Sequence, residues 1–176
     1  KVYDVPVLYF PTFFHPDPTV KRQSGLLKPV LNKSNVLGTS YILPYYHVIS
    51  DSSDITTTPV IFEKSTIMIQ NEYRKVGENY DFLTNFGHVR GYKSSTLNKN
   101  KNISYLFTKL DLDLGLNNFE TSKMYLNIEK TTNDTFLKVF DTNLIENSTS
   151  LKPANKTSLQ SELSFAFDHN NYNLST

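Results

Sequence analysis

The sequence predicts an all-β protein, an antiparallel segment of a transmembrane β-barrel. Three observations support this: strand-like runs recur along the chain, several alternate apolar and polar residues with period 2, and the turns between them are alternately short and long. Transmembrane barrels show such turns, because their loops are short on one side of the membrane and longer on the other. A soluble β-sandwich also has evenly spaced short strands and remains an alternative.

The composition excludes several classes of protein. The chain has 176 residues, a net charge of +1 and no cysteine. The near-zero charge argues against a nucleic-acid partner, and the lack of cysteine excludes a disulfide scaffold within these residues. No apolar run approaches the roughly 18 residues of a transmembrane helix. A membrane barrel is compatible with the mean hydropathy of -0.40, because its strands alternate.

The N-terminal stretch, residues 2–14, consists almost entirely of β-branched, aromatic and proline residues. This composition favours an extended chain buried on both faces over an amphipathic helix. The segment His15-Pro-Asp-Pro18 then requires extended or turn geometry. The chain begins without Met and is expected to be a fragment of a longer protein.

The first two strands of the predicted sheet, Ser24–Leu31 and Leu37–Ile49, each contain a proline, Pro29 and Pro44. A proline in a strand gives up one hydrogen bond of the ladder and is normally confined to edges, strand starts or bulges. The two prolines therefore predict a part of the sheet that is deliberately weakly paired. An edge or rim strand with no opening role is the alternative interpretation.

The later strands bring the predicted total to about nine. The alternation is clearest in Ser104–Gly115, where leucines occupy one face and Lys109, Asp111 and Asp113 the other, so these three charged residues are candidates for a barrel lumen. The longest predicted loops are Lys93–Asn102 and Thr131–Thr157. The other predicted strands are Ile55–Phe62, Ile67–Val76, Tyr80–Tyr92, Met124–Glu129, Leu159–Asp168 and a last one that follows the short turn His169–Asn171.

No pattern of catalytic or metal-binding residues stands out. The histidines are scattered without the spacing of metal ligands, and Asp111 and Asp113 do not supply the ligand count of a calcium site. No phosphate-binding loop or nucleophile motif is present. We therefore expect neither an enzyme nor a cofactor.

Five segments of the sequence are distinctive: Pro6–Pro18, Lys21–Pro29, Leu37–Tyr46, Asp54–Pro59 and Asn71–Arg74. They closely resemble the LPS-assembly protein family of the outer membrane (LptD, the organic solvent tolerance protein). The resemblance implies that residues 1–23 are the end of a periplasmic β-jellyroll with its link, and that residues 24–176 are the N-terminal part of a bacterial outer-membrane barrel.

The same resemblance implies a function. Members of the family insert lipopolysaccharide into the outer leaflet through a lateral gate between the first and last barrel strands, and Pro29 and Pro44 stand in the matching motifs of the gate. The implied partners are lipopolysaccharide, outer-membrane lipids, an LptE-like lipoprotein plug and an LptA-like periplasmic bridge protein. An apolar run before the barrel is a candidate path for acyl chains, or else packs in the jellyroll core: Val7, Leu8, Tyr9, Phe10, Phe13 and Phe14.

Two other functions remain open at the level of the sequence. One is a generic outer-membrane porin or receptor barrel, and the other is a soluble β-sandwich that binds a partner. The sequence upstream of this chain discriminates between them, since a signal peptide and jellyroll favour lipopolysaccharide assembly.

Overall fold

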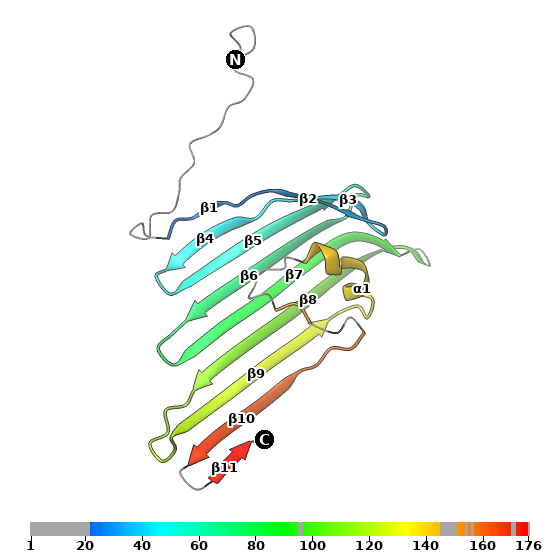
Figure 1. Cartoon of the computed structure of the whole chain (residues 1–176). Helices are drawn as coiled ribbons and strands as arrows, with labels where there is room; N and C mark the ends of the chain where they lie inside the picture. Colours follow the sequence, from blue (N-terminus) through cyan, green and yellow to red (C-terminus); the bar gives the residue numbers. More distant parts are fainter. Residues whose placement is uncertain are drawn as a thin grey trace, which may run out of the picture.

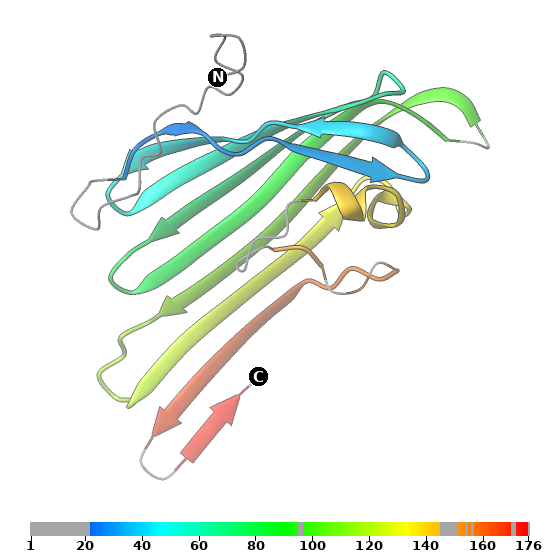
Figure 2. The ribbon, with the colours of Figure 1, turned by 45° about the horizontal axis from the view of Figure 1, so that its top comes forward.

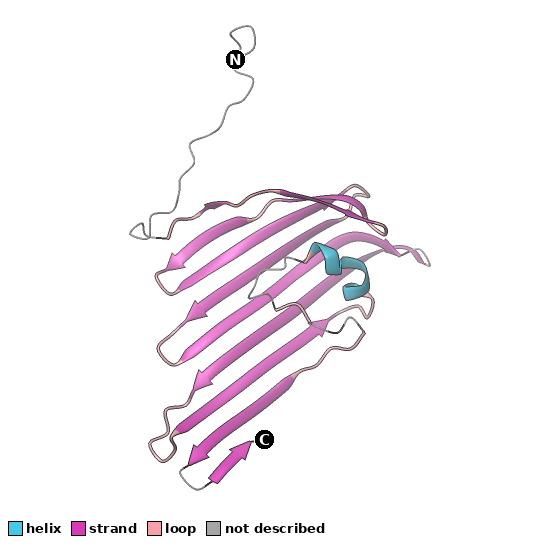
Figure 3. Cartoon of the chain, in the orientation of Figure 1, coloured by secondary structure: helices cyan, strands magenta, loops and turns pink. Residues whose placement is uncertain are grey.

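The computed structural model describes residues 22–94, 97–144, 151–153, 155, 157–169 and 172–175. Its strands join in one 11-stranded antiparallel sheet, and a short helix with a 3-10 turn is inserted near the C-terminal end (Figures 1 and 3). The all-β antiparallel prediction is confirmed. A β-sandwich would divide its strands between two packed sheets, whereas here the described strands belong to one.

The sheet contains about nine strand positions, as the sequence predicts, when β1 with β2 and β3 with β4 are each counted as one interrupted strand. Its path is β1-β4-β5-β6-β7-β8-β9-β10-β11, while β2 pairs with β3 and β3 also pairs with β5. The edges β1 and β11 do not meet, so the sheet is open. The strands are β1 Gly25–Leu26, β2 Val30–Ser34, β3 Gly38–Ile42, β4 Tyr45–Ser50, β5 Ser53–Phe62, β6 Ile67–Val76, β7 Tyr80–Ser94, β8 Leu97–Asp113, β9 Thr121–Thr131, β10 Glu162–His169 and β11 Tyr172–Ser175.

Each of the two proline-containing strands is divided in two. The predicted strand 24–31 becomes β1 and β2 with Pro29 between them, and 37–49 becomes β3 and β4 with Pro44 between them. The prediction of two continuous strands was wrong in this respect. Proline has no N–H to donate and fixes φ near −65°, and at Pro29 and Pro44 the strand is interrupted.

The prediction of a polar loop at Lys93–Asn102 was also wrong. The strand β7 continues to Ser94 and β8 starts at Leu97, so this region is the end of a long hairpin in which Lys93 pairs with Asn100. Backbone pairing supplies the hydrogen bonds whatever the side chains are. The register shifts near Gly91, whose φ of 82° suits glycine and whose missing Cβ leaves room for the carbonyl of Ser65.

The second predicted long loop, Thr131–Thr157, contains a short helix and a 3-10 turn. Within it, α1 (Phe136–Phe140) and η1 (Asp141–Asn143) fold back onto one face of the sheet, over β7 and β8 (Figure 2). The helix begins after an Asn133 side chain that accepts a hydrogen bond from the Thr135 N–H at 2.9 Å. We call the covered side of the sheet the α1 face and the other side the outer face.

Alternation along the strands makes the two faces different. The α1 face holds the buried core, while the outer face carries apolar side chains that are exposed, among them Leu163 at 55% and Ile61 at 54%. A helix long and apolar enough to cross a membrane does not occur among the described residues. The core on the α1 face consists of Leu37, Ile42, Val60, Phe62, Met68, Val89, Tyr92, Ile103, Tyr105, Phe107, Phe136, Leu137, Phe140 and Leu144.

Candidate functional site: the proline hairpin

The four short strands β1–β4 form one edge of the sheet and constitute the candidate site, which we call the proline hairpin (residues 25–50). Among the described strands it pairs with the rest of the sheet only through β5, because β3 and β4 both lie beside that strand. Its other side, the edge of β1 and β2, has no neighbouring strand among the described residues. Any loss of hydrogen bonds to β5 or within the hairpin therefore weakens the attachment of this edge to the sheet.

Pro44 removes a hydrogen bond between the first and second strand positions. The backbone N–H of Leu27 donates to the carbonyl of Pro44 at 2.9 Å. In an antiparallel pair of this kind the two residues exchange both bonds. Pro44 has no N–H to return, so this pair has one bond where two are usual.

Pro59 has the same effect one strand further in. The Leu43 N–H donates to the carbonyl of Pro59 at 3.2 Å, and the reciprocal bond is missing because Pro59 has no N–H. Pro59 was not predicted from the sequence as a weak point of the sheet. The signal was present, since Pro59 lies inside the predicted strand 55–62.

Pro29 acts differently from the other two prolines. Between the pairs Leu26–Tyr45 and Val30–Ile42, three residues of the first strand oppose two of the second, so Pro29 lies in a β-bulge. The residue opposite it is Leu43, whose N–H faces β5. Pro29 therefore removes no hydrogen-bond donor from the pairing between the first and second strand positions. The N–H that it lacks concerns the free edge of the hairpin instead.

A network of charged side chains anchors the lower half of the hairpin, by which we mean the pair β1–β4; the pair β2–β3 is the upper half. The Asp54 carboxylate, whose side chain is 5% exposed, accepts hydrogen bonds from Arg22 and from Arg74 Nε, the latter at 2.7 Å. Arg74 also lies 3.5 Å from Glu72. The hydrogen bond to Tyr46 is the main reason why the pKa of Arg22 is raised, with the Asp54 carboxylate adding to it. The network ties the segment before β1 to β5 and β6.

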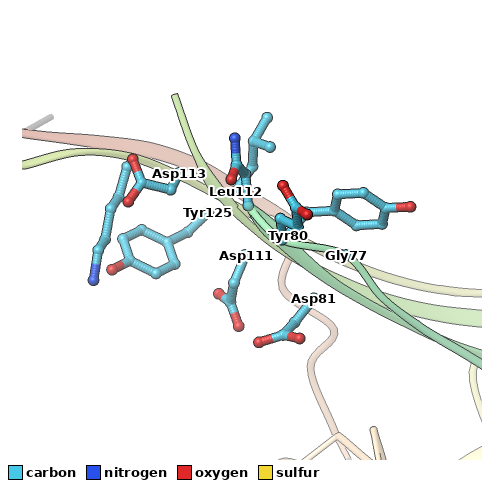
Figure 4. A pocket seen from close by; sticks show the side chains of 10 residues that line it. Gly77, Tyr80, Asp81, Asp111, Leu112, Asp113 and Tyr125 are labelled. Atoms are coloured by element: carbon cyan, nitrogen blue, oxygen red, sulfur yellow. The ribbon is translucent and has the colours of Figure 1, made fainter. Parts of the chain in front are cut away.

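The three predicted lumen residues lie together on one strand. Alternation places Lys109, Asp111 and Asp113 on the same face as Phe107, which is the α1 face, and Lys109 Nζ lies 3.4 Å from Asp111. Figure 4 shows Asp81 and Asp111 pointing to the same side. They line an open pocket of ≈ 370 Å³. Within the described part of the chain no group of three acidic or histidine side chains is arranged to hold a metal.

The predicted acyl-chain path lies outside the described residues. This applies to all six of its members, Val7, Leu8, Tyr9, Phe10, Phe13 and Phe14. Of the predicted N-terminal segment 1–23, the structure describes only Arg22 and Gln23, so the predicted boundary after residue 23 stays a prediction.

Comparison with known proteins found relatives of one kind. The chain is 40% identical over 77 residues to the LPS-assembly protein LptD of a Polaromonas species, 33% identical over 89 residues to that of Pseudoalteromonas translucida, and 27% identical over 140 residues to that of Idiomarina loihiensis. The last alignment covers 80% of this chain. The aligned parts span only 9%, 12% and 18% of these relatives. No family model matches the chain.

Proposed function

Because the chain is related to the LPS-assembly protein family, we propose that it forms the first part of an outer-membrane β-barrel that assembles lipopolysaccharide. The outer face supports this. Exposed Ile61, Ile67, Ile69, Phe86 and Leu106 lie on four neighbouring strands, β5 to β8; such a surface would be a liability in water, but it suits a hydrocarbon surround. The α1 face would then face the lumen, with its charged side chains in water.

The proline hairpin is proposed to be the movable wall of a lateral gate. Lipopolysaccharide carries acyl chains that belong in hydrocarbon and a sugar head that does not, so its exit from a lumen into the outer leaflet requires a barrel seam to open. Each unpaired backbone group in lipid costs several kcal/mol. A seam that already lacks donors loses fewer bonds on opening. The single observation that carries the proposal is the reduced pairing at Pro44 together with the bulge at Pro29 on the free edge.

The remaining parts of the proposal concern partners and an N-terminal segment of which the structure describes only Arg22 and Gln23. Residues 1–23 would be the periplasmic end of a jellyroll, and the apolar run within residues 7–14 would guide acyl chains into the barrel. An LptE-like lipoprotein would plug the lumen, and an LptA-like protein would deliver lipopolysaccharide from the periplasm. The role is transport and assembly, not catalysis.

Cysteine crosslinking of the full-length protein tests the gate. A cysteine at Leu31, on the outer face of the edge strand β2, is paired with cysteines introduced along the last barrel strand. We expect the oxidised pair to stop delivery of lipopolysaccharide to the cell surface and reduction to restore it. The matched control links Ile69 to His88, which are cross-strand partners away from the hairpin, and should leave delivery intact. Normal delivery with a fully crosslinked Leu31 pair would refute the gate.

A further inference from the structure

A buried asparagine at the end of η1 links β3 and β6, the strands on either side of β5. The Asn143 side-chain Nδ2 donates to Ser40 Oγ on β3 at 2.8 Å. The Asn143 carbonyl accepts a hydrogen bond from Gln70 Nε2 on β6 at 2.7 Å. All three residues are at most 2% exposed. A single residue thus bridges the proline hairpin to a strand beyond β5.

The segment that carries Asn143 is fixed to the body of the sheet by aromatic contacts. Phe136 stacks on Tyr105 of β8, with the ring centroids 4.8 Å apart. Phe140 meets Tyr92 of β7 edge-on at 5.4 Å and Phe62 of β5 at 5.8 Å. Such aromatic pairs add to the apolar area that they bury. The α1–η1 segment is therefore anchored outside the hairpin before it reaches Ser40.

We infer that α1–η1 is an internal strut that holds the upper half of the proline hairpin against the sheet, with Asn143 as its positioning residue. The hairpin needs such a support because Pro59 removes a bond between β5 and the hairpin close to Ser40. The lower half has its own anchor, because the Tyr46 hydroxyl accepts a hydrogen bond from Arg22 of the Asp54 network. Release of the strut would free β2 and β3 to separate from β5 while the remaining strands stay paired.

Hydrogen exchange on the purified full-length protein in lipid nanodiscs tests the strut. Ser40→Val and Ser40→Thr add the same branch at Cβ, but only threonine keeps the hydroxyl that Asn143 binds. We expect amides of β3 (residues 38–42) to exchange about tenfold faster in Ser40→Val, the factor that corresponds to about one net hydrogen bond, and Ser40→Thr to restore slow exchange. Asn143→Leu should match Ser40→Val, and combining the two should add little.

The control is Asn127→Leu, which alters an asparagine on the same face whose side chain donates to the Gln160 carbonyl and not to the hairpin. It should leave exchange in β3 unchanged. Unchanged β3 exchange in Asn143→Leu and Ser40→Val, or an equal rise in β8 and β9, overturns the strut, because the first means no support and the second a general loss of stability.

The consequence for lipopolysaccharide delivery rests on the proposed function and is measured separately. Faster local exchange together with altered surface delivery supports both ideas. Faster local exchange with unaltered delivery supports the strut and counts against the gate. The two failures are therefore distinguishable.

Discussion

The double substitution Pro44→Ala and Pro59→Ala tests whether missing donors keep the hairpin loosely paired. Each alanine returns one N–H, facing Leu27 and Leu43 respectively, which already donate in the opposite direction at 2.9 and 3.2 Å. A net backbone hydrogen bond contributes about 0.5–1.5 kcal/mol. Two restored bonds therefore disfavour opening by about 1–3 kcal/mol, which lowers the open population by a factor of roughly 5–150.

Global stability should change much less than local opening. Replacing a proline by alanine gives the unfolded chain more freedom and costs about 0.4–1 kcal/mol at each site. This offsets most of the gain from the restored bonds when the whole protein unfolds. The signature is therefore local: slower hydrogen exchange at the amides of Leu27 and Leu43, with nearly the same overall unfolding transition.

The assay is site-resolved hydrogen exchange on the full-length protein in nanodiscs, alongside surface lipopolysaccharide in cells. Pro29→Ala is the internal control, because Pro29 faces no acceptor on the second strand and should leave Leu27 and Leu43 unchanged. Unchanged exchange at both leucines in the double variant would refute the reasoning about missing donors. Slower exchange without slower delivery would refute only the gating role.

Two further substitutions test the anchor and the packing of the sheet. Asp54→Asn keeps the shape of the side chain but removes the charge between the two arginines. Since the Arg22 side chain is 44% exposed and that of Arg74 32%, we expect a loss of about 1–2 kcal/mol of local stability, seen as faster hydrogen exchange at the start of β4 with β8 unaffected. An unaltered exchange rate would show that the ion pairs contribute nothing there. Gly87→Ala would place a Cβ 2.5 Å from the Ile69 carbonyl and 2.6 Å from the Tyr105 ring. It should destabilise the sheet by about 1–3 kcal/mol in denaturant unfolding, whereas wild-type stability would mean that the ring and strand yield easily.

The β-strands themselves could be predicted because they depend on local pattern. In residues 104–115 the leucines and charged residues alternate, and a period of 2 is compatible only with an extended chain that presents two different faces. Lys109 and Asp111 lie on one face as predicted from this alternation. The interruptions at Pro29 and Pro44 follow from proline chemistry, which acts within a single residue.

The helix α1 could not be predicted in the same way. Phe136 and Phe140 face the same side of a single short turn, and five residues are too few to form a stable helix in isolation. The helix is stable because the ring of Phe136 packs on Tyr105 and that of Phe140 on Tyr92, and both tyrosines lie on strands far away in the sequence. From local pattern alone this stretch is therefore predicted as part of the loop Thr131–Thr157.

What the sequence by itself determined is the strand content, the alternation of faces and the presence of prolines near the start of the sheet. Only the tertiary structure decided which strand boundary each proline affects, because that depends on register and on the direction of each N–H. It also brought Asp54 between Arg22 and Arg74, and Asn143 against Ser40, 103 positions apart. Such contacts arise from the pairing of the whole sheet, which no local pattern specifies.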